Sequence, residues 1–354
     1  MFKGFQYRTV AFMLLFLVLL QVSLDRLIPA QWVFHYRVDY ETIKNDMGTG
    51  LDRAMDRIAR EIQANPAVDY IVLLGDSVAY SGPGGAEQSI AYYLEQWSQA
   101  QGHPLKVYTL AQPGMMLGDV YTELLMLKEH RIPLNRVVID TIYTDYRVHP
   151  ANDPWFGWLG DDLRRLDPTV WAEAGGKAVG AKSWMVAFRQ DLLGWMALWR
   201  DRDILRARIY QALRLSASAE IKDVRPWTEK AWLKNAAEEP AMQLFVDPRP
   251  VDLSAQAESV GMWQRILGQL DGAKTLVFFS PVNPELLGEW LGNPGYQQNL
   301  KRIDGFFAGT GVDYVNWATA MPSASFTDHV HLVPEGYRDL AAMLGERLLT
   351  GPTR

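Results

Sequence analysis

The sequence predicts a three-layer α/β fold with a mostly parallel sheet, a helical insertion and an N-terminal transmembrane helix. Three observations support this prediction. Short apolar runs alternate with helical patterns in two parts of the chain, a helical Trp-rich stretch separates those parts, and an uncharged apolar run lies near the N-terminus. Strand–helix alternation is typical of βαβ units, whose parallel sheet is covered by helices on both faces.

The composition excludes several classes of protein. Thirteen Trp and 12% aromatic residues are too apolar for a disordered chain, and the lack of cysteine excludes disulfides, thiolate zinc sites and a cysteine nucleophile. The net charge of -6 argues against a nucleic-acid partner, because a phosphate-binding face needs an excess of Lys and Arg.

Residues 1–30 are predicted to be a membrane anchor. Lys3 and Arg8 precede a mainly apolar, uncharged run over residues 9–24, which as a helix spans about 24 Å. The alternative is a cleaved signal peptide, with residues 28–30 as the processing site. Positive charge before the run favours a cytoplasmic N-terminus. We therefore expect a single-pass protein of the bacterial inner membrane, with its main domain on the periplasmic or extracellular side.

The elements of that domain follow a polar lead-in over residues 31–68, which ends in a helical pattern at 51–63. The sheet domain then occupies a first part, 69–150, and a second part, 271–354. Strands are predicted at 69–74, 105–110, 136–142, 274–280 and 312–316. Helices are predicted at 86–101, 118–130, 297–307 and 334–349, the last with proline in its first turn.

Residues 151–270 are predicted to be a Trp-rich helical insertion. The stretch has a helical pattern that is broken at Gly175, Gly176 and Pro226, and it contains most of the tryptophans. These side chains either pack on the sheet domain or form an aromatic surface for the membrane, a membrane partner or a sugar chain. Both are open because Trp combines a large apolar area with one hydrogen-bond donor.

Ser77 is the candidate nucleophile. The motif Gly75-Asp76-Ser77 directly follows the first predicted strand, and open parallel sheets bind ligands at the carboxyl ends of their strands. Alone, the motif also fits an ordinary turn or a helix N-cap. Asp76 is expected to fix the turn by accepting hydrogen bonds from nearby backbone N–H groups.

Asp328 and His331 form the candidate base. They lie three residues apart just before the final predicted helix, so both side chains can point to one side of a loop. A serine hydroxyl needs a base within hydrogen-bond reach, and that base needs an acceptor to hold its tautomer. A helix cap beside an incidental His is the alternative. A metal on His329 and His331 is not expected, because no further His or acidic cluster completes the site, and no cofactor is expected.

The two motifs together resemble the SGNH, or GDSL-type, hydrolase family, which has Gly-Asp-Ser near the start and Asp-x-x-His near the end. The resemblance covers about 69–145 and 274–349. It implies an SGNH-hydrolase-like sheet and a catalytic triad of Ser77, His331 as general base and Asp328 as its orienting group. It also implies that the backbone N–H groups of Ser77 and Gly114 stabilise the oxyanion.

A third motif departs from that family, which usually has Gly-x-Asn after the third strand. Residues 140–145 read Asp-Thr-Ile-Tyr-Thr-Asp, so either Thr144 or Tyr143 supplies a hydroxyl to the oxyanion hole, or the hole has two donors. Residues 280–284 look like the Pro-x-Asn of the membrane-anchored branch, with Asn283 as a substrate-binding candidate, or they form a plain turn. Arg147 and His329 either bind substrate or are simply solvated.

The layout is similar to that membrane-anchored branch, which includes alginate and peptidoglycan O-acetyltransferases and the D-alanine transfer protein of teichoic acids. The resemblance implies a serine O-acyltransferase, with acetyl as the expected group, that modifies a cell-envelope or exported polysaccharide through an acyl-serine intermediate. A multi-pass membrane-bound O-acyltransferase would deliver the acyl donor. A carbohydrate esterase and a non-catalytic polysaccharide-assembly protein with the same fold are the alternatives.

Overall fold

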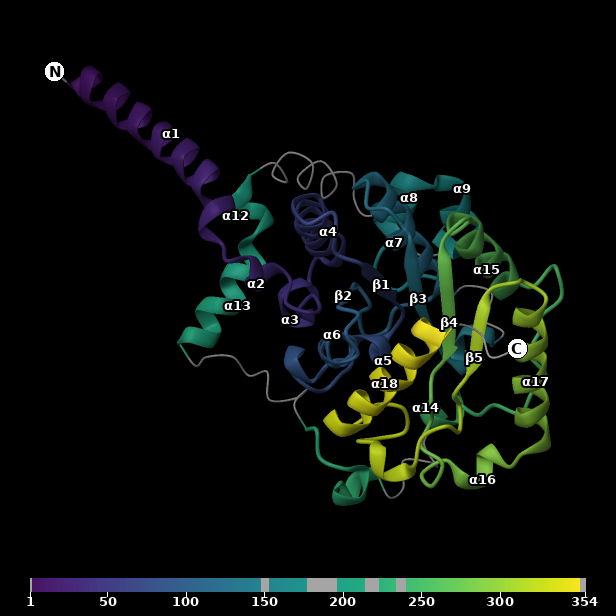
Figure 1. Ribbon diagram of the computed structural model, residues 1–354. Coiled ribbons are helices and arrows are strands. Elements are labelled where there is room, and N and C mark those ends of the chain that lie inside the picture. Colours follow the sequence, from purple (N-terminus) through teal and green to yellow (C-terminus); the bar gives the residue numbers. More distant parts are fainter. Residues whose placement is uncertain (1, 148–152, 177–195, 214–222, 234–239, 351–354) are drawn as a thin grey trace.

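A five-stranded parallel sheet forms the centre of the computed structural model, which describes residues 2–147, 153–176, 196–213, 223–233 and 240–350 (Figure 1). The strand order is β2-β1-β3-β4-β5, and every neighbouring pair is parallel. The strands are β1 (Tyr70–Leu74), β2 (Lys106–Thr109), β3 (Arg136–Thr141), β4 (Lys274–Phe279) and β5 (Asp313–Asn316). The α/β class, the parallel sheet and all five predicted strands are therefore confirmed.

Helices cover both faces of the sheet, as expected for three layers. The chain moves from β1 outward to β2 and then back past β1 to β3, so right-handed crossovers place α6 and α7 on opposite faces. Helix α18 packs against α6, whereas α15 packs against α7 and its Trp263 contacts Phe307 of α17. These helices are α6 (Ile90–Ala100), α7 (Leu117–Glu129), α15 (Glu258–Gln269), α17 (Pro294–Ala308) and α18 (Pro334–Thr350).

The central strands are buried because each has helices on both sides. All five residues of β1, Tyr-Ile-Val-Leu-Leu, are buried, as are the last five of β3. Such continuous apolar runs are typical of parallel strands covered on both faces. The core extends to helix α4 (Met47–Ala64), whose Leu51, Met55 and Ile58 are fully buried.

The expected anchor at residues 1–30 falls on helix α1 (Phe2–Leu27), which extends away from the rest of the molecule (Figure 1). Its large apolar side chains are exposed, from Tyr7 at 75% to Leu19 at 56%. Within the described ranges, no helix has both the length and the apolar character needed to cross a membrane. The transmembrane part of the predicted fold class is thus not confirmed.

Short helices lie in the lead-in and in the described part of residues 151–270. In the lead-in these are α2 (Ala30–Val33) and α3 (Tyr40–Ile43). Farther along the chain are α8 (Gly160–Leu166), α9 (Pro168–Trp171), α12 (Ala197–Arg200), α13 (Arg202–Ala212), α14 (Pro240–Gln243) and, after β4, α16 (Gly288–Leu291).

The described tryptophans of this stretch differ in exposure. Trp155 is buried, and Trp158 and Trp171 are half-buried against the main core. Trp158 also donates its ring N–H to the Pro113 carbonyl oxygen at 2.9 Å. Trp232, in contrast, is 67% exposed. Packing on the sheet domain therefore accounts for the first three, and Trp232 is available to solvent or a ligand; Trp184 and Trp195 lie outside the described residues.

Candidate active site

The carboxyl ends of β1 and β3 define the place where a ligand is expected. The connections from these two neighbouring strands leave in opposite directions, one toward β2 and the other toward β4. At such a switch point the loops separate and leave a crevice outside the sheet edge. The motif Gly75-Asp76-Ser77 follows β1 directly, so the sheet carries Ser77 to this position.

The turn that bears Ser77 is closely packed on β3. Gly75 has a backbone φ of +134°, and a Cβ atom there would lie 2.5 Å from the Cβ of Asp140. Only glycine fits both the conformation and the space. Asp76 accepts a hydrogen bond from the Val78 N–H at 2.9 Å, as predicted. Ser77 is the first residue of helix α5 (Ser77–Tyr80) and is half-buried, whereas Val78, like the rest of α5, is buried.

Asp140 supports this turn from behind. Its two carboxyl oxygens accept hydrogen bonds from the Ala79 N–H at 3.1 Å and from the Ser280 hydroxyl. Burial, followed by the nearby charge of Asp76, raises the pKa of Asp140 well above its usual range. Together, Asp76 and Asp140 satisfy the N–H groups of Val78 and Ala79. None of the described hydrogen bonds uses the backbone N–H of Ser77. This N–H group can therefore donate to a negatively charged oxygen.

Asp328 and His331 are brought together as a hydrogen-bonded pair. His331 Nδ1 lies 2.8 Å from Asp328 Oδ2, and Asp328 Oδ1 accepts from the N–H groups of Val330 and His331 at 3.0 and 2.8 Å. An ionised carboxylate only accepts, so Nδ1 carries the proton and Nε2 is left as the basic nitrogen. This is the orientation that a general base for a serine hydroxyl requires.

The charges of this pair reinforce each other. Burial alone would raise the pKa of Asp328, but the two neighbouring histidines and the Val330 N–H outweigh it and hold that pKa well below its usual range. Burial alone would lower the pKa of His331, yet the attraction of Asp328, with a contribution from Asp76, raises it above 6.5. Asp328 therefore stays ionised at neutral pH, and His331 is a stronger base than a free imidazole.

The two ends of the chain meet at this site. The charge of Asp76, next to Ser77, acts on His331. Tyr337, six residues after His331, donates its hydroxyl to the Gly82 carbonyl oxygen at 2.5 Å. The sheet thus holds the serine turn and the Asp–His loop against each other.

The expected oxyanion groups have different surroundings. Gly114 is exposed in the loop after β2, with a φ of +74°. Thr144 is half-buried in the loop after β3. Tyr143 is 1% exposed, and its hydroxyl donates to the Asp247 carbonyl oxygen at 2.5 Å while accepting from Asn299. Tyr143 therefore has a structural position, and Thr144 is the remaining candidate for a side-chain hydroxyl.

Asn283 is buried and holds the base loop in place, so the expectation that it binds substrate is corrected. Its amide donates to the Asp328 carbonyl oxygen at 3.0 Å, and its backbone N–H donates to the His329 carbonyl oxygen at 2.9 Å. Its side-chain oxygen accepts from the Ser323 hydroxyl. These contacts occupy the side chain and leave no polar atom for a sugar.

His329 and Arg147 are both partly enclosed. Burial lowers the pKa of His329 to about 4, and the ring stacks edge-on with Phe245 at 4.6 Å. His329 is therefore a neutral, enclosed side chain rather than a solvated one. Arg147 lies near Asp247, whose pKa is lowered mainly by Arg249 and to a smaller extent by Arg147. No contact in the described structure joins either residue to Ser77.

Two supporting residues were not predicted from the sequence. Arg37, in the lead-in, is 8% exposed and donates to the carbonyl oxygens of Tyr80 and Ser81 at 2.5 and 2.8 Å and to that of Gly84. A single arginine in a polar segment gives no signal of this role. Asp140 does give one, because it is a carboxylate that directly follows the apolar residues 137–139 of β3.

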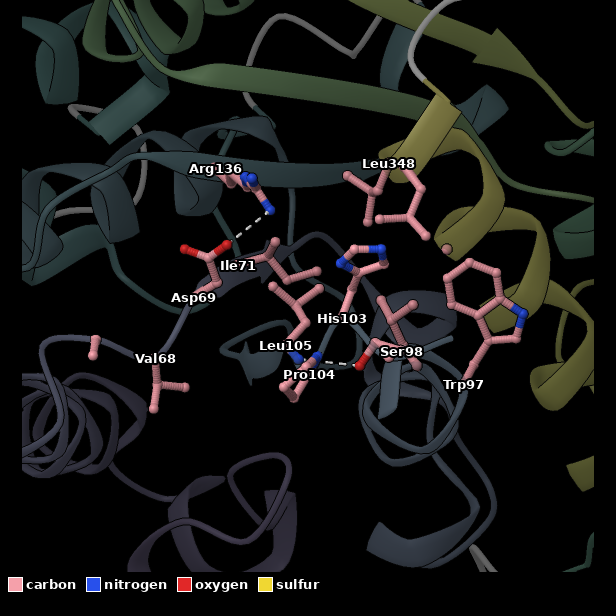
Figure 2. Close-up of a pocket in the computed structure, with 15 residues that line it drawn as sticks. Val68, Asp69, Ile71, Trp97, Ser98, His103, Pro104, Leu105, Arg136 and Leu348 are labelled. Carbon is pink, nitrogen blue, oxygen red and sulfur yellow. Dashed lines mark hydrogen bonds and ion pairs between the residues drawn. The ribbon is translucent and has the colours of Figure 1, made fainter. Parts of the chain in front are cut away.

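A cavity of about 380 Å³ lies at the opposite edge of the sheet. Figure 2 shows it bounded by residues near the amino ends of the strands, with Asp69 and Arg136 paired at 3.7 Å. Trp97, Leu105 and Leu348 form apolar walls. It contains none of the Ser–His–Asp residues and is separate from the candidate active site.

The fold and the site define an α/β protein with a Ser–His–Asp constellation at the carboxyl edge of a parallel sheet. No protein-family model and no curated protein matches the chain. Solved structures that it resembles include Est24, a carbohydrate acetylesterase from Sinorhizobium meliloti (10% identity, TM-score 0.38, covering 80% of this chain and 99% of that one). Another is the inhibitor-bound aryl esterase of M. smegmatis (12% identity, TM-score 0.37, covering 80% of this chain and 99% of that one).

Proposed function

We propose that the chain is a serine-dependent O-acyltransferase of SGNH type that modifies a polysaccharide through an acyl-serine intermediate. The observation that carries the proposal is the Asp328–His331 pair. It lies under the electrostatic influence of Asp76 beside Ser77, and its hydrogen bond leaves the other imidazole nitrogen basic. A serine, a base and an orienting carboxylate are the groups that acyl transfer requires.

The mechanism follows from these positions. His331 Nε2 takes the proton of the Ser77 hydroxyl as its oxygen attacks the carbonyl carbon of an acyl donor. The negative charge that develops on the carbonyl oxygen is bound by the N–H groups of Ser77 and Gly114, with Thr144 as a third donor. His331 then gives its proton to the leaving group, which departs and leaves an acyl-serine ester.

The second half of the reaction returns the enzyme to its starting state. His331 takes the proton of an acceptor sugar hydroxyl, whose oxygen attacks the acyl-serine. When the bond to Ser77 breaks, the proton passes from His331 to the serine oxygen. Trp232 supports a carbohydrate acceptor, because it is 67% exposed and belongs to a segment that contacts the base loop.

A carbohydrate esterase is the second candidate function. It uses the same residues, with water in place of the sugar hydroxyl in the second step. The His331 side chain is 24% exposed, which supports access of water to the base. The acceptor in the second step, rather than the triad, separates the two activities.

We further propose that helix α1 holds the enzyme at the outer side of the bacterial inner membrane, where a multi-pass membrane-bound O-acyltransferase supplies the acyl group. The exposed apolar side chains of α1, from Tyr7 to Leu19, support this location. A non-catalytic assembly role is the outcome expected if the site proves inactive.

The first prediction concerns the release of p-nitrophenol from p-nitrophenyl acetate. Ser77→Ala and His331→Ala should each lower the rate by about 10³-fold or more, because each removes one half of the nucleophile–base pair. His103→Ala, at the opposite edge of the sheet, is the matched control and should keep the wild-type rate. Wild-type rates in both site variants would refute the triad.

An oligosaccharide acceptor then separates transfer from hydrolysis. Mass spectrometry of the wild-type reaction should detect the acyl-sugar ester if the chain is a transferase, whereas free acid alone would assign it as an esterase. A protein that forms neither product and binds the polysaccharide equally well after Ser77→Ala would be an assembly protein.

A further inference from the structure

One segment of the Trp-rich stretch lies against the loop that carries the candidate base. We call residues 223–230 the strap. The Trp227 N–H donates to the Phe326 carbonyl oxygen at 3.0 Å. The Thr327 hydroxyl lies 2.7 and 3.0 Å from the carbonyl oxygens of Arg225 and Asp223. The strap is thus hydrogen-bonded to the two residues that immediately precede Asp328.

Lys230 lies at the centre of this contact. It is 5% exposed, and its ammonium donates to the Asp223 carbonyl oxygen at 2.8 Å and to the Thr327 hydroxyl oxygen at 2.5 Å. Both acceptors are neutral, and the Asp223 carboxylate is itself bound by Arg225 at 2.8 Å. A cation buried without a carboxylate in direct contact is costly.

The charge of Lys230 reaches the triad. Burial lowers the pKa of Lys230, while the negative charges of Asp223 and Asp328 oppose that effect. In turn, Lys230 lowers the pKa of His331 and so acts against the larger effect of Asp328 and the contribution of Asp76. The charged and titratable groups that face His331 are therefore Asp328, Asp76, Lys230 and the neighbouring His329.

We propose that Lys230 is a positioning residue for the Asp328–His331 pair. Its ammonium fixes Thr327, and with it the start of the base loop, and its positive charge favours the neutral form of His331. The strap, which belongs to the Trp-rich stretch, would thereby help to position the proposed base. The inference rests on the proposed function, because only a reaction that uses neutral His331 benefits from this charge.

Asp328 and Lys230 have opposite effects on His331. Asp328 makes His331 basic and oriented, but the same attraction favours imidazolium, which cannot accept the serine proton. The positive charge of Lys230 opposes that tendency without removing the orienting hydrogen bond. Lys230 is suited to this task because a point charge on a buried stem acts over several ångströms in a region of low dielectric.

The test is a titration of His331 in the full chain, followed by NMR of ¹³C-labelled histidine. Lys230→Gln retains a hydrogen-bonding group but removes the charge, and we expect the His331 midpoint to rise by about half a pH unit or more. The acid limb of the p-nitrophenyl acetate profile should move by the same amount, which lowers the rate at pH 6 about threefold. Lys230→Arg should restore both values.

Lys128→Gln is the matched control, since Lys128 lies on the exposed surface of α7 and donates to Gln269. It should leave the His331 midpoint unchanged. If Lys230→Gln does not fold, Thr327→Val is the second variant. It retains the charge of Lys230 but removes the hydrogen bond between Lys230 and the base loop. It should lower the rate of ester hydrolysis and move the His331 midpoint by less than about half a pH unit. An unchanged rate and midpoint in that variant would overturn the proposal.

The readouts separate this inference from the proposed function. An unchanged His331 midpoint in folded Lys230→Gln, with an active wild-type enzyme, would overturn the inference alone. A shifted midpoint in a protein without acyl-transfer or esterase activity would leave the charge effect in place and refute the function.

Discussion

Asp328 controls two properties of His331: which nitrogen carries the proton, and how strongly the ring binds a second one. Its Oδ2 lies 2.8 Å from Nδ1, and its charge raises the pKa of His331 above 6.5. Because the reaction needs the neutral ring, the rate should rise with pH and reach half its maximum above pH 6.5.

Asp328→Asn tests both properties. Without the negative charge, the pKa of His331 should fall, and the acid limb of the pH–rate profile should move to lower pH. The plateau rate should fall by about 10³- to 10⁴-fold, because an amide can donate to Nδ1 and favour the wrong tautomer. The measurement is p-nitrophenyl acetate hydrolysis between pH 5 and 9; an acid limb that stays in place would contradict the pairing.

Gly75 gives a prediction about stability. A Cβ atom would meet Asp140 at 2.5 Å in a conformation that L-residues rarely adopt, so Gly75→Ala should lower the free energy of unfolding by about 2 kcal/mol or more. Gly268→Ala is the matched control. No atom lies within 4 Å of its added methyl group, and alanine favours a helix, so its stability should be equal or slightly higher in urea unfolding.

For single residues, the sequence predicts those contacts that join residues close together in the chain. Asp76, Asp328 and His331 make contacts with residues only two or three positions away, and spacing alone indicates such contacts. Asn283 was misjudged because its partners, 40 and 45 positions away, decide whether an amide faces a substrate or a loop. Arg37 was missed for the same reason.

Helices α4 and α7 are joined by an ionic contact with a clear pH dependence. His130, at the end of α7, lies 2.8 Å from Asp52 and 3.1 Å from Asp56 of α4. Hydrogen bonds to these two carboxylates raise the pKa of His130 to about 9. A histidine whose pKa is raised by folding stabilises the native state fully below its unfolded value, about 6.5, and this contribution is lost as pH rises through about 9.

His130→Gln should therefore lower the free energy of unfolding at pH 6 by about 2 kcal/mol, allowing for the half-exposed aspartates. The difference between variant and wild type should shrink toward zero by pH 10. Urea unfolding at pH 6, 8 and 10 measures it, with His103→Ala as the control for an exposed histidine. A difference that is constant over this range would show that the contact is not ionic.

Elements were predictable where one pattern covers the whole segment. The apolar runs of β1 and β3 mark their position to within about a residue, because both faces of these strands are buried. The single turn of α5 has only four residues, too few for a helical period to show. Helix α15 was assigned to the insertion because its pattern lies beside other helical segments, although it packs on α7.

For the whole molecule, the strand order was beyond the reach of the sequence. Alternation predicts parallel strands, but which strands pair depends on contacts between residues far apart in the chain. The order β2-β1-β3-β4-β5 is nevertheless what creates the switch point beside Ser77. The two distant motifs suggested one site because their chemistry is complementary, not because any local pattern joined them.

Tyr337→Phe tests the bond that joins the two parts of the sheet domain. The hydroxyl of this fully enclosed side chain donates to Gly82 in the loop after the nucleophile helix. Its loss should lower the free energy of unfolding by about 1–3 kcal/mol, since a buried carbonyl loses its partner, and should also lower the hydrolysis rate. Calorimetry and the ester assay report the two effects. Tyr7→Phe, on exposed α1, should change neither, and a Tyr337→Phe enzyme with wild-type stability would contradict this account.

The hydrogen bond from Tyr337 to Gly82 joins positions 255 residues apart. During synthesis the ribosome therefore releases the serine turn long before His331, the base that we propose for it, has been made. On the proposed mechanism, a nascent chain that has not yet reached His331 has no general base for Ser77, whose hydroxyl is then an ordinary alcohol.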